Sequence, residues 1–299
     1  MAREQSGTRG SFAPPPKPEL ITSLGSLRSF LATVCSSARL YIELHGHRLS
    51  RQGDLTLMTV RAYPHPGIYV IDIQSLGHEA FTARSVFGLT LQSVLENPGL
   101  RKVFWDVRDA ADALWGHHGV RIQGVVDLQL LENASRRRRP PCEGPERHSR
   151  SGNGRGTGRG TGRDTGRDTG RGRGGVRGRS QAYVQDLDTA IRRDLSVSAA
   201  EGEHIARLRR VMASRLSLTA FRLRPLDDDT AAFCANGIRY LPQLHTVYME
   251  RITGEWLRKV KMETFRRLEA AFGPPYDPQS PTKALGPWAD TTKPGPLFR

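Results

Sequence analysis

Glu43 and His45 are the side chains whose types and spacing come nearest to a reactive site. A single residue, Leu44, separates them in the apolar segment 38–45. Because alternate side chains of a strand point to the same face, we expect both on one side of a sheet. A carboxylate and an imidazole can share a metal ion, and the nitrogen suits zinc or manganese better than magnesium. A histidine that ends a strand beside Gly46 more often packs structurally, which is the favoured interpretation.

Four further polar residues look chemical but have simpler structural explanations. Asp72 ends an apolar segment, where a strand-end role is expected. Asp127 begins a helical segment, where a carboxylate caps backbone N–H groups. His117 and His118 are adjacent on an expected helix and face different directions, so they cannot easily hold one ion. None of the four is predicted to be catalytic.

The segments around these residues alternate between strand and helix patterns. Leu20 to Ser36 carries apolar residues at three- and four-residue spacings, which predicts an amphipathic helix. The alternation favours an α/β fold, with helices on the faces of a sheet whose first three strands form a meander. Strands are predicted at 38–45, 55–62, 68–73, 102–105 and 125–128. Helices are predicted at 90–96, 108–117, 129–134, 186–194, 204–214, 228–236 and 240–272.

Composition divides the chain into one domain and three segments outside it. Residues 20–135 and 181–272 carry the apolar patterns and are expected to form a single domain. Residues 1–19 are rich in Pro, Gly and Ser and are expected to be a disordered tail, and 273–299 an irregular Pro-rich tail. Residues 136–180 contain repeats of Thr-Gly-Arg-Gly or Thr-Gly-Arg-Asp, which predict a disordered, Arg/Gly-rich insertion.

Most of the positive charge comes from this insertion. The formal net charge is +15, and residues 136–179 contain 14 arginines against four acidic residues, which contributes +10. The remaining +5 is an ordinary surface balance. A Gly-Arg segment can bind RNA or single-stranded DNA, although a tandem repeat that expanded in a tolerant loop explains it equally well. The candidate nucleic-acid contacts are Arg155, Arg159, Arg163, Arg167, Arg171 and Arg173.

Cysteine use and hydropathy favour an intracellular protein. Cys35, Cys142 and Cys234 are too few and too widely spaced for a disulfide framework or a zinc site. No stretch of about 18 apolar residues occurs, so no membrane partner is expected. Nucleus and cytoplasm are open alternatives, because only the four arginines at 136–139 resemble a nuclear localisation signal.

Four blocks of the sequence resemble a known family when they are taken together. They are LYIELHGHRLSRQG, IYVIDIQSLG, KVFWDVRDAADALWGHHGVRIQGVVDLQLLE and FCANGIRYLPQL. Together they resemble the 3'-5' exonuclease domain family of the ribonuclease D type, within the DEDD superfamily. The blocks occur in the family's order over about residues 20–265, with the insertion excluded. The resemblance implies a ribonuclease H-like fold, a mixed sheet flanked by helices and followed by a helical C-terminal part.

The same resemblance implies where a nuclease of this family would hold its metals. Four carboxylates bind two divalent ions that activate a water and stabilise the leaving oxygen. The matching positions are Glu43, His45, Ala110 and Gly237, and Phe233 stands where the family has a tyrosine that orients the water. None of the four positions has the acidic residue that the family has there, and only Glu43 keeps a carboxylate. The chain is therefore expected to be a catalytically degenerate member that needs no cofactor.

Three functional hypotheses follow. The first is a protein that binds RNA or single-stranded DNA in the exonuclease fold without hydrolysing it. The second is an active 3'-5' exonuclease with a remodelled site, in which Glu43, His45 and a displaced acid such as Asp109 or Asp112 hold Mg²⁺ or Mn²⁺. The third is a scaffold for a protein partner, which gains weight if the surface near Glu43, Ala110 and Gly237 is neutral or apolar.

Overall fold

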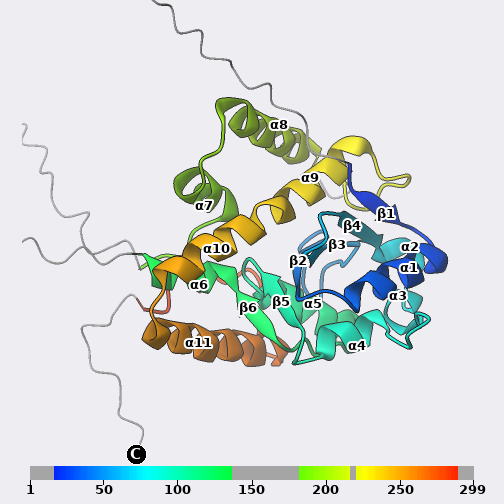
Figure 1. Ribbon diagram of the computed structural model, residues 1–299, viewed down its shortest axis with the longest axis horizontal. Coiled ribbons are helices and arrows are strands. Elements are labelled where there is room, and N and C mark those ends of the chain that lie inside the picture. Colours follow the sequence, from blue (N-terminus) through cyan, green and yellow to red (C-terminus); the bar gives the residue numbers. More distant parts are fainter. Residues whose placement is uncertain (1–16, 137–181, 216–219, 289–299) are drawn as a thin grey trace, which may run out of the picture.

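The apolar segments of the first half of the chain form one mixed sheet (Figure 1). The computed structural model describes residues 17–136, 182–215 and 220–288. The strand order is β1-β4-β3-β2-β5-β6, with antiparallel pairing in the β2-β3-β4 meander and parallel pairing of β1 with β4, β5 with β2 and β6 with β5. The strands are β1 Glu19–Ile21, β2 Arg39–His45, β3 Leu57–Tyr63, β4 Ile68–Asp72, β5 Arg101–Phe104 and β6 Val125–Asp127.

Helices cover both faces of this sheet, which confirms the predicted α/β fold class. The first helices are α1 Leu24–Val34, α2 Ile73–Leu76, α3 Glu79–Thr82, α4 Leu91–Glu96, α5 Arg108–His118 and α6 Leu128–Ser135. The later ones are α7 Leu187–Asp194, α8 Ala199–Arg215, α9 Asp228–Arg239, α10 Leu241–Arg251, α11 Gly254–Phe272 and the 3-10 turn Pro281–Ala284. Among the described residues, no helix is both long and apolar enough to cross a membrane.

Alternation along β2 decides which residues face which layer. Leu40, Ile42 and Leu44 belong to the larger core cluster, which also contains buried residues of α1, α4 and α5. Tyr41 belongs to a second cluster with residues of α6, α7 and α10. Because side chains alternate along a strand, Glu43 shares the face of Tyr41. Glu43 and His45 therefore lie in the layer that contains α9 and α10.

The start of the fold corrects two expectations. Leu20 was expected in a helix and Glu19 in a tail, but both lie in β1, which pairs in parallel with β4. The helix begins only at Leu24, because the Ser23 hydroxyl accepts a hydrogen bond from Ser26 N and caps it.

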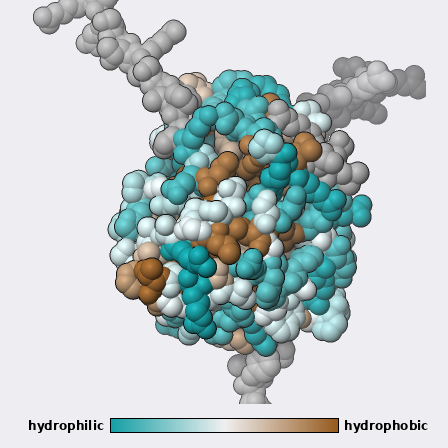
Figure 2. Space-filling view, turned by 90° about the vertical axis from the view of Figure 1, so that its right-hand side faces the viewer, coloured by the Kyte–Doolittle hydropathy of each residue, from teal (hydrophilic) through white to brown (hydrophobic). Residues whose placement is uncertain are grey.

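Seen from the side on which β1 lies in Figure 1, the surface is mostly hydrophilic, with apolar side chains in a band across its middle (Figure 2).

The long helix predicted at 240–272 is two helices. α10 ends at Arg251 and α11 begins at Gly254, with Ile252 and Thr253 in extended conformations between them. Two β-branched residues followed by glycine have low helix propensity, which makes this the weakest point of the periodic pattern. The break lets α11 pack against α5 and α6 in a separate layer (Figure 1).

The segments flanking the predicted insertion meet at one place on the surface. Arg136 Nη1 and Asn133 Nδ2 both donate to the carbonyl oxygen of Tyr183, at 2.8 and 3.0 Å. The insertion itself, apart from Arg136, lies outside the described residues. In the C-terminal segment, residues 273–288 pack on the domain, with Trp288 edge-on to Trp256 at 5.4 Å between ring centroids.

Candidate functional site

Helix α9 crosses the sheet face that carries Glu43 and His45. It contacts β2, β3 and β4 and brings Phe233, Cys234 and Gly237 to that face. Asp227 caps the helix by accepting from Asp229 N and Thr230 N at 3.1 Å, which fixes where the helix begins. The Phe233 to Gly237 spacing is one helical turn, so both residues face the sheet.

Glu43 and Gly237 are in direct contact. A Cβ atom on Gly237 would lie only 2.0 Å from Glu43 Oε2, so the carboxyl occupies the space that any side chain at 237 would need. Oε2 is buried and has no hydrogen-bond partner among the described residues. Burial, with a smaller effect from the Asp188 charge, raises the pKa of Glu43 to about 8. The carboxyl is therefore predominantly protonated at neutral pH.

His45 is a packed and hydrogen-bonded core residue. Its Nε2 shares a hydrogen bond of 3.1 Å with Thr59 Oγ1, and its ring stacks on Phe221 at 5.3 Å between centroids. Phe233 lies edge-on to the same ring at 6.4 Å. Burial lowers the pKa of His45 to about 4, so the imidazole is neutral at pH 7. Its surroundings are those of a structural histidine.

Ala110, which the sequence resemblance predicts as the third metal-binding position, is buried in the larger core cluster and carries only a methyl group. The acids on either side of it have other partners. Asp109 accepts from Tyr276 Oη at 2.6 Å and from Lys283 Nζ at 2.5 Å. Asp112 is fully buried and binds Arg51 Nε at 2.5 Å and Arg51 N at 2.7 Å. Each acid is already neutralised by a cation of the fold.

These residues do not fit a pair of divalent metals. Hard cations need several anionic oxygens, whereas this site offers one protonated carboxyl, one neutral imidazole, a methyl group and a glycine. Across the described ranges, no group of three or more His, Cys, Asp or Glu side chains is placed to hold a metal ion. The residues at these positions therefore lack the ligands that two divalent metals would need.

Asp72 and Asp127 both serve as helix caps and ion-pair partners. Asp127 is fully buried, accepts from Gln129 N at 3.1 Å and binds Arg267 Nη1 at 2.7 Å. Asp72 accepts from Ser75 N at 3.0 Å and pairs with Arg224 Nε at 2.5 Å. These contacts agree with the structural roles expected from their places at the ends of strands.

The two adjacent histidines of α5 also have separate surroundings. His117 Nε2 lies 2.9 Å from the carbonyl oxygen of Ser50, whereas His118 stacks on Phe81 at 4.1 Å between centroids. Burial lowers the pKa of His118 to about 4, with smaller effects from His117 and His78. His117 and His118 therefore do not form a binding site for one metal ion.

Asp188 is a neighbour of the site that the sequence pattern did not reveal. It lies in α7, is 7% exposed and forms an ion pair with Arg209. Burial raises its pKa, and its charge contributes to the raised pKa of Glu43. No local motif marks this residue, because its proximity to Glu43 depends on how α7 packs.

The predicted nucleic-acid contacts from Arg155 to Arg173 lie outside the described residues.

Comparisons with known proteins identify the fold. No family model and no curated protein matches the sequence. Ribonuclease D of Trypanosoma brucei in complex with GMP is 16% identical with a TM-score of 0.64, over 89% of this chain and 68% of that one. The same enzyme in complex with RNA U12 is 15% identical with a TM-score of 0.60, over 89% and 75%. Escherichia coli ribonuclease D, an exoribonuclease involved in structured RNA processing, is 13% identical with a TM-score of 0.51, over 86% and 51%. The ribonuclease D-type exonuclease fold is thereby confirmed.

Proposed function

We propose that this chain binds RNA or single-stranded DNA and does not cleave it through the metal site of its fold. The observation that carries the proposal is the contact between the Glu43 carboxyl and Gly237. A carboxylate at position 237 and the oxygen of Glu43 would compete for one space. The Glu43 side chain therefore fills the space that a metal-binding carboxylate at position 237 would need.

The chemistry of phosphodiester hydrolysis supports the loss of cleavage. Two-metal catalysis relies on anionic oxygens that hold both ions and lower the pKa of the attacking water. The raised pKa of Glu43 leaves that carboxyl mostly uncharged at neutral pH. His45, Ala110 and Gly237 supply no negative charge. Removing even one catalytic group usually costs orders of magnitude in rate.

Binding is supported by the fold and by the arginine-rich segment. Solved structures of T. brucei ribonuclease D with this fold contain RNA U12 or GMP. The +10 charge of residues 136–179 would attract phosphates and release counterions, which makes binding fall steeply with salt. Gly-Arg segments contact single-stranded RNA without requiring a particular sequence.

A binding titration tests the proposal. Fluorescence anisotropy of labelled single-stranded RNA and DNA would be measured at several salt concentrations for the full chain and for two variants. One variant changes all six candidate contacts to glutamine, and its matched control changes them to lysine, which keeps the charge. The candidate contacts are Arg155, Arg159, Arg163, Arg167, Arg171 and Arg173.

The expected result is binding by the full chain, with the salt slope reduced by about 0.7 for each phosphate contact that the glutamine variant loses. The lysine control should retain most of the slope. Absence of strand binding at low salt by the full chain would overturn the proposal and favour the protein scaffold.

A further inference from the structure

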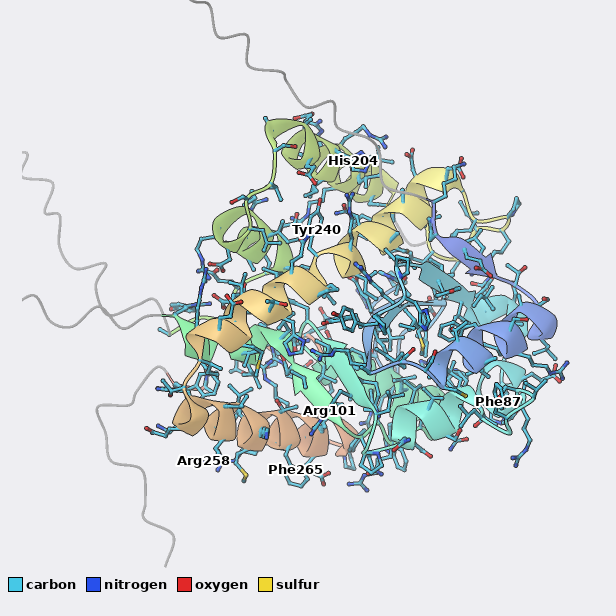
Figure 3. All side chains as sticks on the ribbon, in the orientation of Figure 1. Phe87, Arg101, His204, Tyr240, Arg258 and Phe265 are labelled. Carbon is cyan, nitrogen blue, oxygen red and sulfur yellow. The ribbon has the colours of Figure 1, made fainter. Side chains whose placement is uncertain are left out.

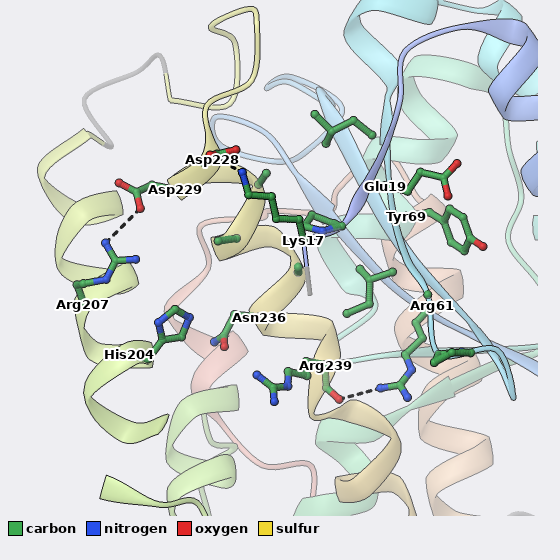
Figure 4. A pocket seen from close by; sticks show the side chains of 18 residues that line it. Lys17, Glu19, Arg61, Tyr69, His204, Arg207, Asp228, Asp229, Asn236 and Arg239 are labelled. Carbon is green, nitrogen blue, oxygen red and sulfur yellow. Dashed lines mark hydrogen bonds and ion pairs between the residues drawn. The ribbon is translucent and has the colours of Figure 1, made fainter. Parts of the chain in front are cut away.

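A pocket of about 620 Å³ lies between α8, α9 and the edge of the sheet formed by β1, β3 and β4 (Figure 4). None of the five family positions lines it. From α9 it receives Ala232, Ala235, Asn236 and Arg239, which lie on other sides of the helix than Gly237. The pocket is therefore separate from the site around Glu43.

Two arginines and one asparagine in this pocket have buried polar atoms without partners. Within the described ranges, Arg61 Nε, Arg239 Nη1 and Asn236 Oδ1 are buried and make no hydrogen bond. Asn236 is only 7% exposed. Leaving a buried donor or acceptor without a partner is unfavourable. The two guanidinium donors and the amide oxygen therefore mark this pocket as a place where a ligand can supply missing partners.

The two arginines reach the pocket from different elements of the fold, Arg61 from β3 and Arg239 from α9. Arg61 reaches from β3 and donates through Nη1 to the carbonyl oxygen of Arg239 at 3.2 Å. The Arg239 side chain points toward α8, where His204 lies (Figure 4). Its closest acid, Glu201, is 4.0 Å away, at the limit of an ion pair. Among the described residues, one N–H group of each guanidinium therefore has no hydrogen-bond partner.

The charge balance of the pocket favours an anion near these arginines. The four cations that line the pocket exceed its three acids by one charge. Asp228 binds Lys17 at 2.7 Å and Asp229 binds Arg207 at 3.1 Å, and the third acid, Glu19, lies beside Tyr69, away from Arg239 (Figure 4). Burial lowers the pKa of His204, and the charges of Arg207 and Arg239 lower it further, as expected where the local potential is positive.

The rest of the wall is apolar and can enclose the body of a ligand. It contains one aromatic ring and several aliphatic side chains, and its volume lies within the range of small-molecule sites. These side chains are Leu20, Ile68, Tyr69, Ala231, Ala232 and Ala235.

We propose that this pocket binds a small ligand with an oxyanion head, a phosphate or a carboxylate, joined to an apolar or aromatic body no larger than a nucleotide. Arg61 and Arg239 bind the head, and the apolar wall encloses the body. Planar guanidinium groups match the spacing of phosphate and carboxylate oxygens, which makes arginine suited to both heads.

Isothermal titration of the full chain tests the proposal with adenosine monophosphate, octanoate and inorganic phosphate. The expected result is that one of the two ligands with a body binds at least tenfold more tightly than inorganic phosphate, and which one binds identifies the head. Arg239→Gln should weaken that binding at least tenfold. Arg258→Gln is the matched control, because Arg258 is exposed on α11, far from the pocket (Figure 3).

A second variant keeps every charge and fills the pocket. Ala235→Leu should weaken binding of the ligand with a body and leave the folded chain intact by circular dichroism. Glu43→Ala should leave binding unchanged, which separates this pocket from the family site. Absence of binding by all three compounds at millimolar concentration, or equal binding by the native chain and Arg239→Gln, would overturn the proposal.

Discussion

Replacing Glu43 by glutamine should remove a specific part of the pH dependence of stability. In the folded protein the pKa of Glu43 is raised to about 8 from its ordinary value of 4.5. Between these values the folded state binds a proton that the unfolded state has released. Stability from the protonated carboxyl is therefore complete below about pH 4.5 and is lost as pH rises through 8.

The size of this effect follows from the shift. Each unit of difference in pKa corresponds to 1.36 kcal/mol. Integrated from pH 5 to pH 9, the native chain should lose about 4 kcal/mol that Glu43→Gln does not lose. Since whole domains are stable by only about 5–15 kcal/mol, this is a large fraction.

Urea unfolding at pH 5, 7 and 9 measures the difference. We expect the free energy of unfolding of Glu43→Gln, relative to the native chain, to rise steadily over this range. Glu79→Gln is the control, because Glu79 is exposed on α3 and its carboxylate is hydrated in both states. Parallel pH profiles for the native chain and Glu43→Gln would refute the burial argument.

Three other substitutions test neighbouring contacts. Gly237→Ala should cost about 1–2 kcal/mol by forcing the Glu43 carboxyl aside, and in a Glu43→Ala background it should be neutral or stabilising; equal costs in both backgrounds in a double-mutant cycle would show that the contact is absent. Arg267→Leu should cost about 3 kcal/mol by leaving Asp127 buried without its cation, and chemical denaturation would contradict this if it detected no loss. For His45, the lowered pKa means that its stability contribution is present above pH 6.5 and is lost as pH falls toward 4, by about 3 kcal/mol. His45→Gln should lose less stability than the native chain between pH 7 and pH 4.5, and equal losses in denaturant titrations would speak against a buried neutral imidazole.

Periodicity predicted the elements that are long and one-sided. The meander β2-β3-β4 and helix α5 lie close to their predicted bounds, because their apolar residues recur with a clear period. β1 was missed because it has three residues and only Ile21 is buried. The boundary between α10 and α11 was missed because the interrupting residues Ile252 and Thr253 also fit a weak helical pattern.

The candidate site was accessible from sequence only where a motif linked distant segments. The family pattern grouped Glu43 with Gly237, and the structure places them in contact. It gave no sign of Asp188 or Phe221, whose positions depend on the packing of segments far away in the chain. Nor could it show that Asp109 and Asp112 bind Lys283 and Arg51, because ion pairs of this kind have no spacing rule.

A single-turnover degradation assay tests the central claim most directly. Single strands of RNA and DNA, labelled at either end, would be incubated with the full chain and Mg²⁺, Mn²⁺ or Zn²⁺, and binding would be followed in the same samples. We predict that strands are bound and keep their length. Stepwise shortening from the 3' end that disappears in Glu43→Ala would contradict the account and reveal a working metal site at this carboxyl.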